Sequence, residues 1–215
     1  MPTILLIRHG ENAYVKKGRL AGRLPGVHLN DTGRAQAAAL AEALRGLPIQ
    51  GVYSSPLERT METAAPLAEA LGQPVRPLEG LLEVDFGAWQ DKTLKSLRRR
   101  KLWRIVQAHP ARMRFPEGET FAQAQQRIVS ALESIVQAHP DPKALLACIS
   151  HSDLIKLAVA YYLGLPLDLF QRLHIAPASI TALHLPPEGG AALLALNYRL
   201  DWLETLRTML TPPAR

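Results

Sequence analysis

The chain has 215 residues, of which 47% are hydrophobic and 20% are charged, and its formal net charge is +6 at neutral pH. This length and composition predict one domain, residues 1–215, with a sizeable core, and the positive charge favours anionic partners. A membrane span is excluded because no apolar run is long enough to cross a bilayer, and an internal disulfide is excluded because Cys148 is the only cysteine.

The first predicted element is a buried strand over residues 3–7, which is almost entirely aliphatic and leads into Arg8, His9 and Gly10. Open α/β sheets bind ligands at the carboxyl ends of their strands, where these residues fall. Arginine is a planar, permanent cation suited to phosphate, and histidine is a nitrogen nucleophile near neutral pH. Gly10 is expected to turn the backbone and to leave room for a substrate. The tripeptide alone leaves an ordinary strand end with surface side chains equally open.

The loop over residues 18–28 is punctuated by glycine and proline and contains Arg19 and Arg23. Both arginines are near enough in sequence to the first strand to reach a substrate anion, and solvated loop arginines are the alternative. The elements that follow are predicted from their apolar periodicity and capping residues. They are a helix over residues 33–44, a strand over 49–53, a helix over 56–71 that carries Arg59, and an edge-like strand over 75–78.

Residues 89–116 differ from the rest of the chain because cations crowd them. The apolar spacing inside this segment is helical, which predicts an amphipathic helix with a basic face. Two interpretations remain open: a cap over the site whose field attracts a multiply charged substrate, or a solvated face without a role in selection. The cations are Lys92, Lys95, Arg98, Arg99, Arg100, Lys101 and Arg104.

The second half of the chain repeats the alternation of helix and strand. A helix is predicted over residues 119–137, and an apolar strand over 144–150 is expected to lie in the centre of the sheet with Cys148 as a buried, unreactive thiol. Its end carries His151, and a helix follows over 154–163. Residues 179–185 and 191–198 form a predicted hairpin, and residues 202–210 a short helix.

Four ordered motifs carry a resemblance to a known family. They are residues 3–12, 54–64, 82–89 and 149–153. In these motifs and their spacing the chain resembles the histidine phosphatase superfamily, the phosphoglycerate-mutase-like family, over nearly its whole length. The resemblance implies a three-layer α/β/α sandwich, consistent with the predicted alternation, with a mostly parallel sheet, an antiparallel edge strand and a helical cap formed by residues 89–116.

The resemblance also implies roles for five residues. His9 is the nucleophile that forms a phosphohistidine, Arg8 and Arg59 hold the phosphoryl oxygens, and His151, expected to be cationic during the reaction, is a third donor. Glu83 is the acid that protonates the leaving oxygen and then activates water. Asp85 is the alternative acid, because it lies two residues further along and points the same way in an extended segment.

Further phosphate-binding candidates are Asn12, Ser152 and Arg23, and for Asn12 a loop-capping role is the alternative. The chain departs from the family at Ser152 and Asp153, where many members have two glycines. A carboxylate beside a phosphate is repulsive unless it turns away to cap the helix or pair with an arginine. The sequence has no recognisable metal-ligand spacing, so neither a metal nor a cofactor is expected.

The leading prediction is therefore a phosphomonoesterase that acts on a small phosphorylated metabolite. The alternatives are a phosphomutase of the same family and a degenerate, non-catalytic member that binds a phosphorylated ligand. No nucleic acid partner is expected, because aromatic residues do not interleave the basic run beyond Trp103. No membrane contact is expected, and a homodimer is one option for the oligomeric state. The N-terminus lacks the pattern of a signal peptide, which makes the cytoplasm the expected compartment.

Overall fold

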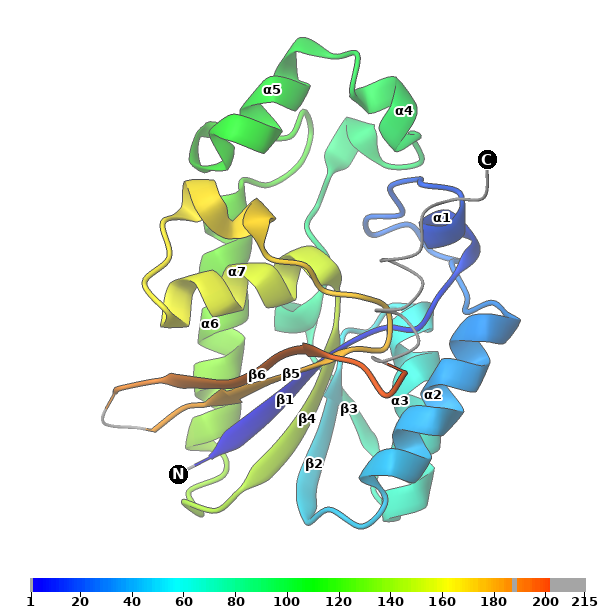
Figure 1. Cartoon of the computed structure of the whole chain (residues 1–215), viewed down its shortest axis with the longest axis vertical. Helices are drawn as coiled ribbons and strands as arrows, with labels where there is room; N and C mark the ends of the chain where they lie inside the picture. The colour runs from blue at the N-terminus through cyan, green and yellow to red at the C-terminus, as the bar shows by residue number, and fades with distance from the viewer. Residues whose placement is uncertain (1, 187–188, 202–215) are drawn as a thin grey trace.

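A six-stranded sheet forms the centre of the computed structural model, which describes residues 2–186 and 189–201 (Figure 1). The strand order is β3-β2-β4-β1-β5-β6, so β4 is central, as predicted from its apolar sequence. Strands β1 to β4 pair in parallel, β5 is antiparallel to β1, and β6 is antiparallel to β5. The strands are β1 (Thr3–Arg8), β2 (Ile49–Ser54), β3 (Val75–Pro77), β4 (Leu145–Ser150), β5 (Ile180–His184) and β6 (Ala192–Tyr198).

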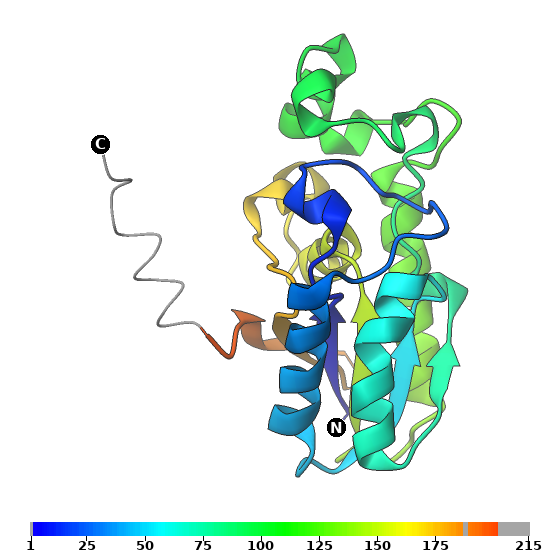
Figure 2. The ribbon, with the colours of Figure 1, turned by 90° about the vertical axis from the view of Figure 1, so that its right-hand side faces the viewer.

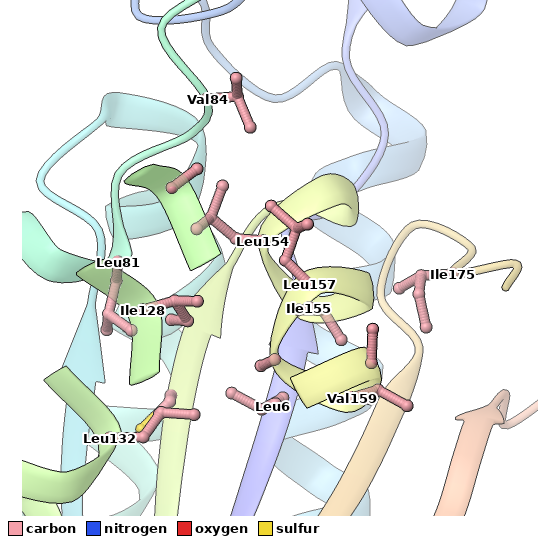
Figure 3. Packing of buried hydrophobic residues seen from close by; sticks show 14 of the residues in the cluster. Leu6, Leu81, Val84, Ile128, Leu132, Leu154, Ile155, Leu157, Val159 and Ile175 are labelled. Atoms are coloured by element: carbon pink, nitrogen blue, oxygen red, sulfur yellow. The ribbon is translucent and has the colours of Figure 1, made fainter. Parts of the chain in front are cut away.

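Helices cover both faces of this sheet, which confirms the predicted sandwich (Figure 2). Alternate residues of β1 separate the two cores: Leu5 and Ile7 pack with the α2–α3 side, and Ile4 and Leu6 with the α6–α7 side. Figure 3 shows Leu6 on the latter side, near Leu132 of α6 and Val159 of α7. The helices are α1 (Ala13–Lys16), α2 (Asp31–Leu44), α3 (Glu58–Leu71), α4 (Leu94–Leu97), α5 (Lys101–Ala108), α6 (Phe121–Gln137) and α7 (Ser152–Tyr162), with 3₁₀ turns at Glu79–Leu81, Gly87–Trp89, Pro110–Arg112 and Leu167–Arg172.

Cys148 lies inside β4 and is fully buried, in agreement with the predicted structural thiol. Burial raises its pKa, because an apolar surrounding disfavours the thiolate. The predicted short helix over residues 202–210 falls outside the described residues. The predicted hairpin is present as β5 and β6.

The basic segment is not the single helix that its sequence suggests. It forms α4 and α5, separated by a turn at residues 98–100. Leu97 is fully buried, and in a continuous helix the residues three, four and seven positions later would lie on the same face. Those residues, 100, 101 and 104, are all cations. The turn changes the helical phase, so that Val106 is buried while all seven cations from Lys92 to Arg104 are exposed.

Close backbone packing joins the end of β1 to the start of α2. Asn30 caps α2 by accepting a hydrogen bond from the Gly33 N–H at 2.8 Å. A Cβ added to Gly33 would lie 2.0 Å from the Glu11 carbonyl oxygen, and one added to Gly10 would lie 2.7 Å from the Gly33 carbonyl oxygen. Gly10 is therefore required for packing against α2, and its expected role in leaving room for a substrate stays a prediction.

We expect Gly33→Ala to lower the free energy of unfolding by about 1–3 kcal/mol, because the added methyl group overpacks a rigid backbone contact. This loss occurs although alanine is the better helix former by about 1 kcal/mol. Urea unfolding at constant pH measures the change. Gly46→Ala is the matched control, since its Cβ would meet nothing within 4 Å. Equal stabilities of the two variants would contradict the packing argument.

Candidate active site

The parallel strands bring the predicted site residues to one edge of the sheet. Arg8 is the register neighbour of Ser150 across β1 and β4, which places His9 beside His151 with ring centroids 5.3 Å apart. Arg59 enters from the first turn of α3, and Glu83 from the segment after β3. Arg8, His9, Arg59 and Glu83 line a cavity of about 360 Å³, and His151 is fully buried beside it.

His9 is held with one ring nitrogen free. Its Nδ1 lies 2.7 Å from the Gly10 carbonyl oxygen, and because a carbonyl only accepts hydrogen bonds, Nδ1 carries the proton. The lone pair is thus on Nε2. Burial, and after it the cations Arg59 and Arg8, lower the pKa of His9 well below its usual value. The imidazole is therefore neutral at physiological pH, which is the form that a nucleophile requires.

The contacts and burial of His151 favour a neutral ring in this structure, and its expected cationic form during the reaction stays a prediction. Its Nδ1 lies 3.3 Å from the Arg59 guanidinium, which can only donate, so Nδ1 accepts and the Nε2–H donates to Ser55 Oγ at 2.9 Å. Burial first, then the charges of Arg59 and its neighbours, hold the pKa of His151 well below its usual value. Ser55 orients this ring, a role that the sequence did not reveal although Ser55 lies within one of the four motifs.

Four buried donor atoms of charged or amide side chains at the site have no partner among the described residues: Arg8 Nε, Arg59 Nε and Nη1, and Asn12 Nδ2. The Nε1–H of Trp89, which also lines the cavity, is a fifth. Other atoms of the same side chains are fixed, since Arg8 donates to the Ile175 carbonyl oxygen and Arg59 to the Gly22 carbonyl oxygen, both at 2.7 Å. Buried donors left unpaired are costly, and an anion with several acceptor oxygens satisfies them together. This donor set fits a phosphoryl group.

Asn12 combines the two roles that the sequence left as alternatives. Its Oδ1 accepts a hydrogen bond from the Val15 N–H at 2.9 Å and caps α1. Its Nδ2 is one of the unpartnered donors, and the residue lines the cavity. The cap holds the amide in place and leaves its donor available to an anion.

Glu83 has the environment of a general acid. Burial first, and then the charge of Asp153, raise the pKa of its carboxyl group to about 7, against the opposing hydrogen bond from the Val84 N–H and the cations Arg59 and Arg8. Its Oε2 lies 4.0 Å from His151 Nδ1. Such a carboxyl group is partly protonated near neutral pH and can both donate and accept a proton.

Asp85, the alternative acid, does not line the cavity. Its Oδ1 accepts a hydrogen bond from the Gly87 N–H at 2.9 Å and stabilises the turn that follows. The side chain thus has a local structural role. Between the two carboxylates, the geometry favours Glu83.

Arg23 is not among the residues that line the cavity, so its placement corrects the expectation that it binds phosphate. Its Nε donates to the Glu83 carbonyl oxygen, and its Nη2 pairs with Glu119, both at 2.9 Å. Arg127 pairs with the same carboxylate at 2.8 Å and donates to the Leu82 carbonyl oxygen at 2.8 Å. These residues hold the backbone of the Glu83 segment. No sequence signal marks Glu119 or Arg127, because they lie outside the motifs.

Ser152 and Asp153, the departure from the family pattern, both line the cavity. Asp153 lies in the first turn of α7, and it pairs with Lys156 at 3.3 Å and not with an arginine. Its charge remains close enough to raise the pKa of Glu83. The carboxylate of Asp153, at a position where many family members have glycine, therefore favours the protonated form of Glu83.

Within residues 2–186 and 189–201, no group of three or more His, Cys, Asp or Glu side chains is arranged to hold a metal ion. Across the same residues, no helix has the length and apolar character needed to cross a membrane.

Comparison with known proteins agrees with this geometry. The model of the histidine phosphatase superfamily (branch 1) matches residues 4–198. Phosphoserine phosphatase 1 of Hydrogenobacter thermophilus is 28% identical over 199 residues, covering 92% of each chain, and the probable phosphoglycerate mutase GpmB of Erwinia tasmaniensis is 30% identical over 183 residues, covering 84% of each. The mycobacterial glucosyl-3-phosphoglycerate phosphatase has a TM-score of 0.84 at 27% identity, over 92% of this chain and 99% of that one.

The chain therefore belongs to the histidine phosphatase superfamily, branch 1. With the phosphatases among its relatives, it is a phosphoric monoester hydrolase.

Proposed function

We propose that this protein hydrolyses a small phosphorylated metabolite through a phosphohistidine intermediate on His9. The observation that carries the proposal is the arrangement of unpartnered donors from Arg8, Asn12 and Arg59 in the cavity that contains a neutral imidazole with a free Nε2. Phosphoryl transfer requires this combination of a positioned nucleophile and preorganised positive groups.

The proposed reaction has two steps. In the first, His9 Nε2 attacks the phosphorus atom, the bond to the ester oxygen breaks, and the leaving alkoxide takes the proton of Glu83. In the second, the ionised Glu83 removes a proton from water, whose oxygen attacks the phosphohistidine and breaks the P–N bond. Inorganic phosphate leaves, and Glu83 is protonated again. A carboxyl group with a pKa of about 7 suits both directions of proton transfer.

The two other hypotheses from the sequence have less support. The relation to the probable phosphoglycerate mutase favours a mutase, but the phosphoserine and glucosyl-3-phosphoglycerate phosphatases favour hydrolysis. Phosphoglycerate mutases of this family carry an Arg-His-Tyr-type sequence just after the acid, whereas Val84-Asp85-Phe86 follows Glu83 here. A non-catalytic binding protein would not need a carboxyl group with a raised pKa beside a neutral histidine.

Release of inorganic phosphate from a panel of monoesters tests the proposal. We expect steady release that is unchanged by a chelator and inhibited by vanadate and by excess phosphate, because the chemistry needs only the side chains of the site. Loss of activity on chelation that a divalent ion restores would contradict the mechanism. Transfer of the phosphoryl group within or between substrates without net phosphate release would identify a mutase, and binding of esters without turnover would identify a binding protein.

A further inference from the structure

We propose that this site selects phosphate monoesters whose alcohol part is apolar and uncharged. The inference rests on the proposed function, since it concerns the part of the same cavity that lies beyond the phosphate-binding donors. It differs from the hypothesis that the basic segment selects a multiply charged substrate.

The wall of the cavity beyond the donors is dominated by apolar side chains. They come from the loop before α2, from the segment after Glu83, from α4 and α5, and from the segment that leads into α6. Most of them are buried and form the layer that underlies the cavity surface. The apolar lining residues are Leu20, Phe86, Trp89, Leu94, Trp103, Val106, Phe115 and Phe121.

Three of these side chains, Leu20, Leu94 of α4 and Trp103 of α5, are only partly buried and offer apolar surface to an entering group. Trp103 stacks on Trp89, with ring centroids 6.3 Å apart and an angle of 17° between the planes. This contact restrains the orientation of the Trp103 ring. Trp89 is itself buried against Phe115. A rigid aromatic wall of this kind favours burial of carbon over burial of charged groups.

The charges around the cavity disfavour a second anionic group. Among the described lining residues, the cations are Arg8, Arg59 and Arg19. The first two carry the phosphate-binding donors, and Arg19 is paired with Asp91 at 2.7 Å. A carboxylate on the alcohol would therefore lie near Asp153, whose pairing with Lys156 at 3.3 Å offsets only part of its charge, and would find no unpaired cation among these lining residues.

The basic segment does not change this balance. None of its seven cations lines the cavity, and all are exposed to solvent, while Leu94 and Trp103 of the same segment face the cavity. The change of helical phase at residues 98–100 lets α4 and α5 each keep their cations exposed while Leu94 and Trp103 line the cavity. The cap thus presents its apolar side to the substrate.

A series of esters with the same phosphate group and similar leaving groups tests the inference: methyl phosphate, butyl phosphate, glycerol 1-phosphate and 3-phosphoglycerate. We expect kcat/KM to rise from methyl to butyl phosphate by about fourfold for each methylene that is buried. The kcat/KM for glycerol 1-phosphate should be lower than that for butyl phosphate, and 3-phosphoglycerate should have the lowest kcat/KM of the series. Equal values for methyl and butyl phosphate, or a preference for 3-phosphoglycerate, would overturn the inference. If no ester at all is hydrolysed, the proposed function itself fails.

Variants in residues 89–116 test whether this segment causes the preference for butyl phosphate. Trp103→Ala and Leu94→Ala should each reduce the ratio between butyl and methyl phosphate, and the second guards against a folding defect in the first. The combined replacement of Arg98, Arg99 and Arg100 by Gln is the matched control from the same segment, and it should leave the ratio unchanged. If this control selectively lowers kcat/KM for 3-phosphoglycerate and flattens its salt dependence, charge attraction governs selection and the inference is wrong.

Discussion

Replacing His9 with alanine is expected to abolish turnover, with a loss on the order of 10⁴-fold or more, because the nucleophile of a covalent mechanism has no substitute. The imidazole is neutral, and its Nε2 is directed by the hydrogen bond between Nδ1 and the Gly10 carbonyl oxygen. Rapid quenching after mixing with a labelled phosphoester should trap an acid-labile label on the wild-type protein and none on His9→Ala.

The control for this prediction is His109→Ala. His109 is exposed at the end of α5 and does not line the cavity, so its loss should change neither activity nor labelling. Circular dichroism of both variants should match the wild type, because His9 contributes a single side chain at the end of a strand whose backbone remains paired. Retention of most activity by His9→Ala would assign the nucleophile elsewhere.

The second large effect is expected for Glu83→Gln. With an alkyl phosphate, whose leaving oxygen needs a proton, the rate should fall by roughly 10²–10⁴-fold, the usual contribution of general acid catalysis. With an activated aryl phosphate, whose aryl oxide leaves with little protonation, the loss of rate in the first step should be much smaller. Single-turnover release of the alcohol measures this step separately from hydrolysis of the intermediate. Equal losses on both esters would contradict the role of Glu83 as the acid, and a larger loss in Asp85→Asn would transfer that role to Asp85.

The pH profile tests the same residue independently. A general acid must be protonated in the free enzyme, so kcat/KM for an alkyl phosphate should decline as the pH rises through about 7, the pKa of Glu83. Glu83→Gln should lack this decline, because an amide does not titrate. Asp153→Asn removes the charge that helps to raise this pKa, and the decline should begin at a lower pH. A profile that is identical in wild type and Asp153→Asn would show that Asp153 does not influence the acid.

The alternation of strands and helices, and the residues proposed to carry the chemistry, can be predicted from the sequence alone. Strand β4 is recognisable because a central strand is buried on both faces and is apolar throughout, and Arg8, His9 and His151 are recognisable because they follow strands whose carboxyl ends meet at one edge. These features depend on local periodicity and on the order of motifs, which a single chain displays directly.

The protonation states of His9, His151 and Glu83 follow from the tertiary structure alone, because burial and the charges of residues distant in sequence set each pKa. The tertiary structure also decided that Arg23 supports the Glu83 backbone, since its partner Glu119 lies 96 positions away. The break in the basic segment follows from the same cause: which face of a helix is buried depends on what packs against it. Local sequence shows which side chains are present, and long-range packing decides what surrounds them.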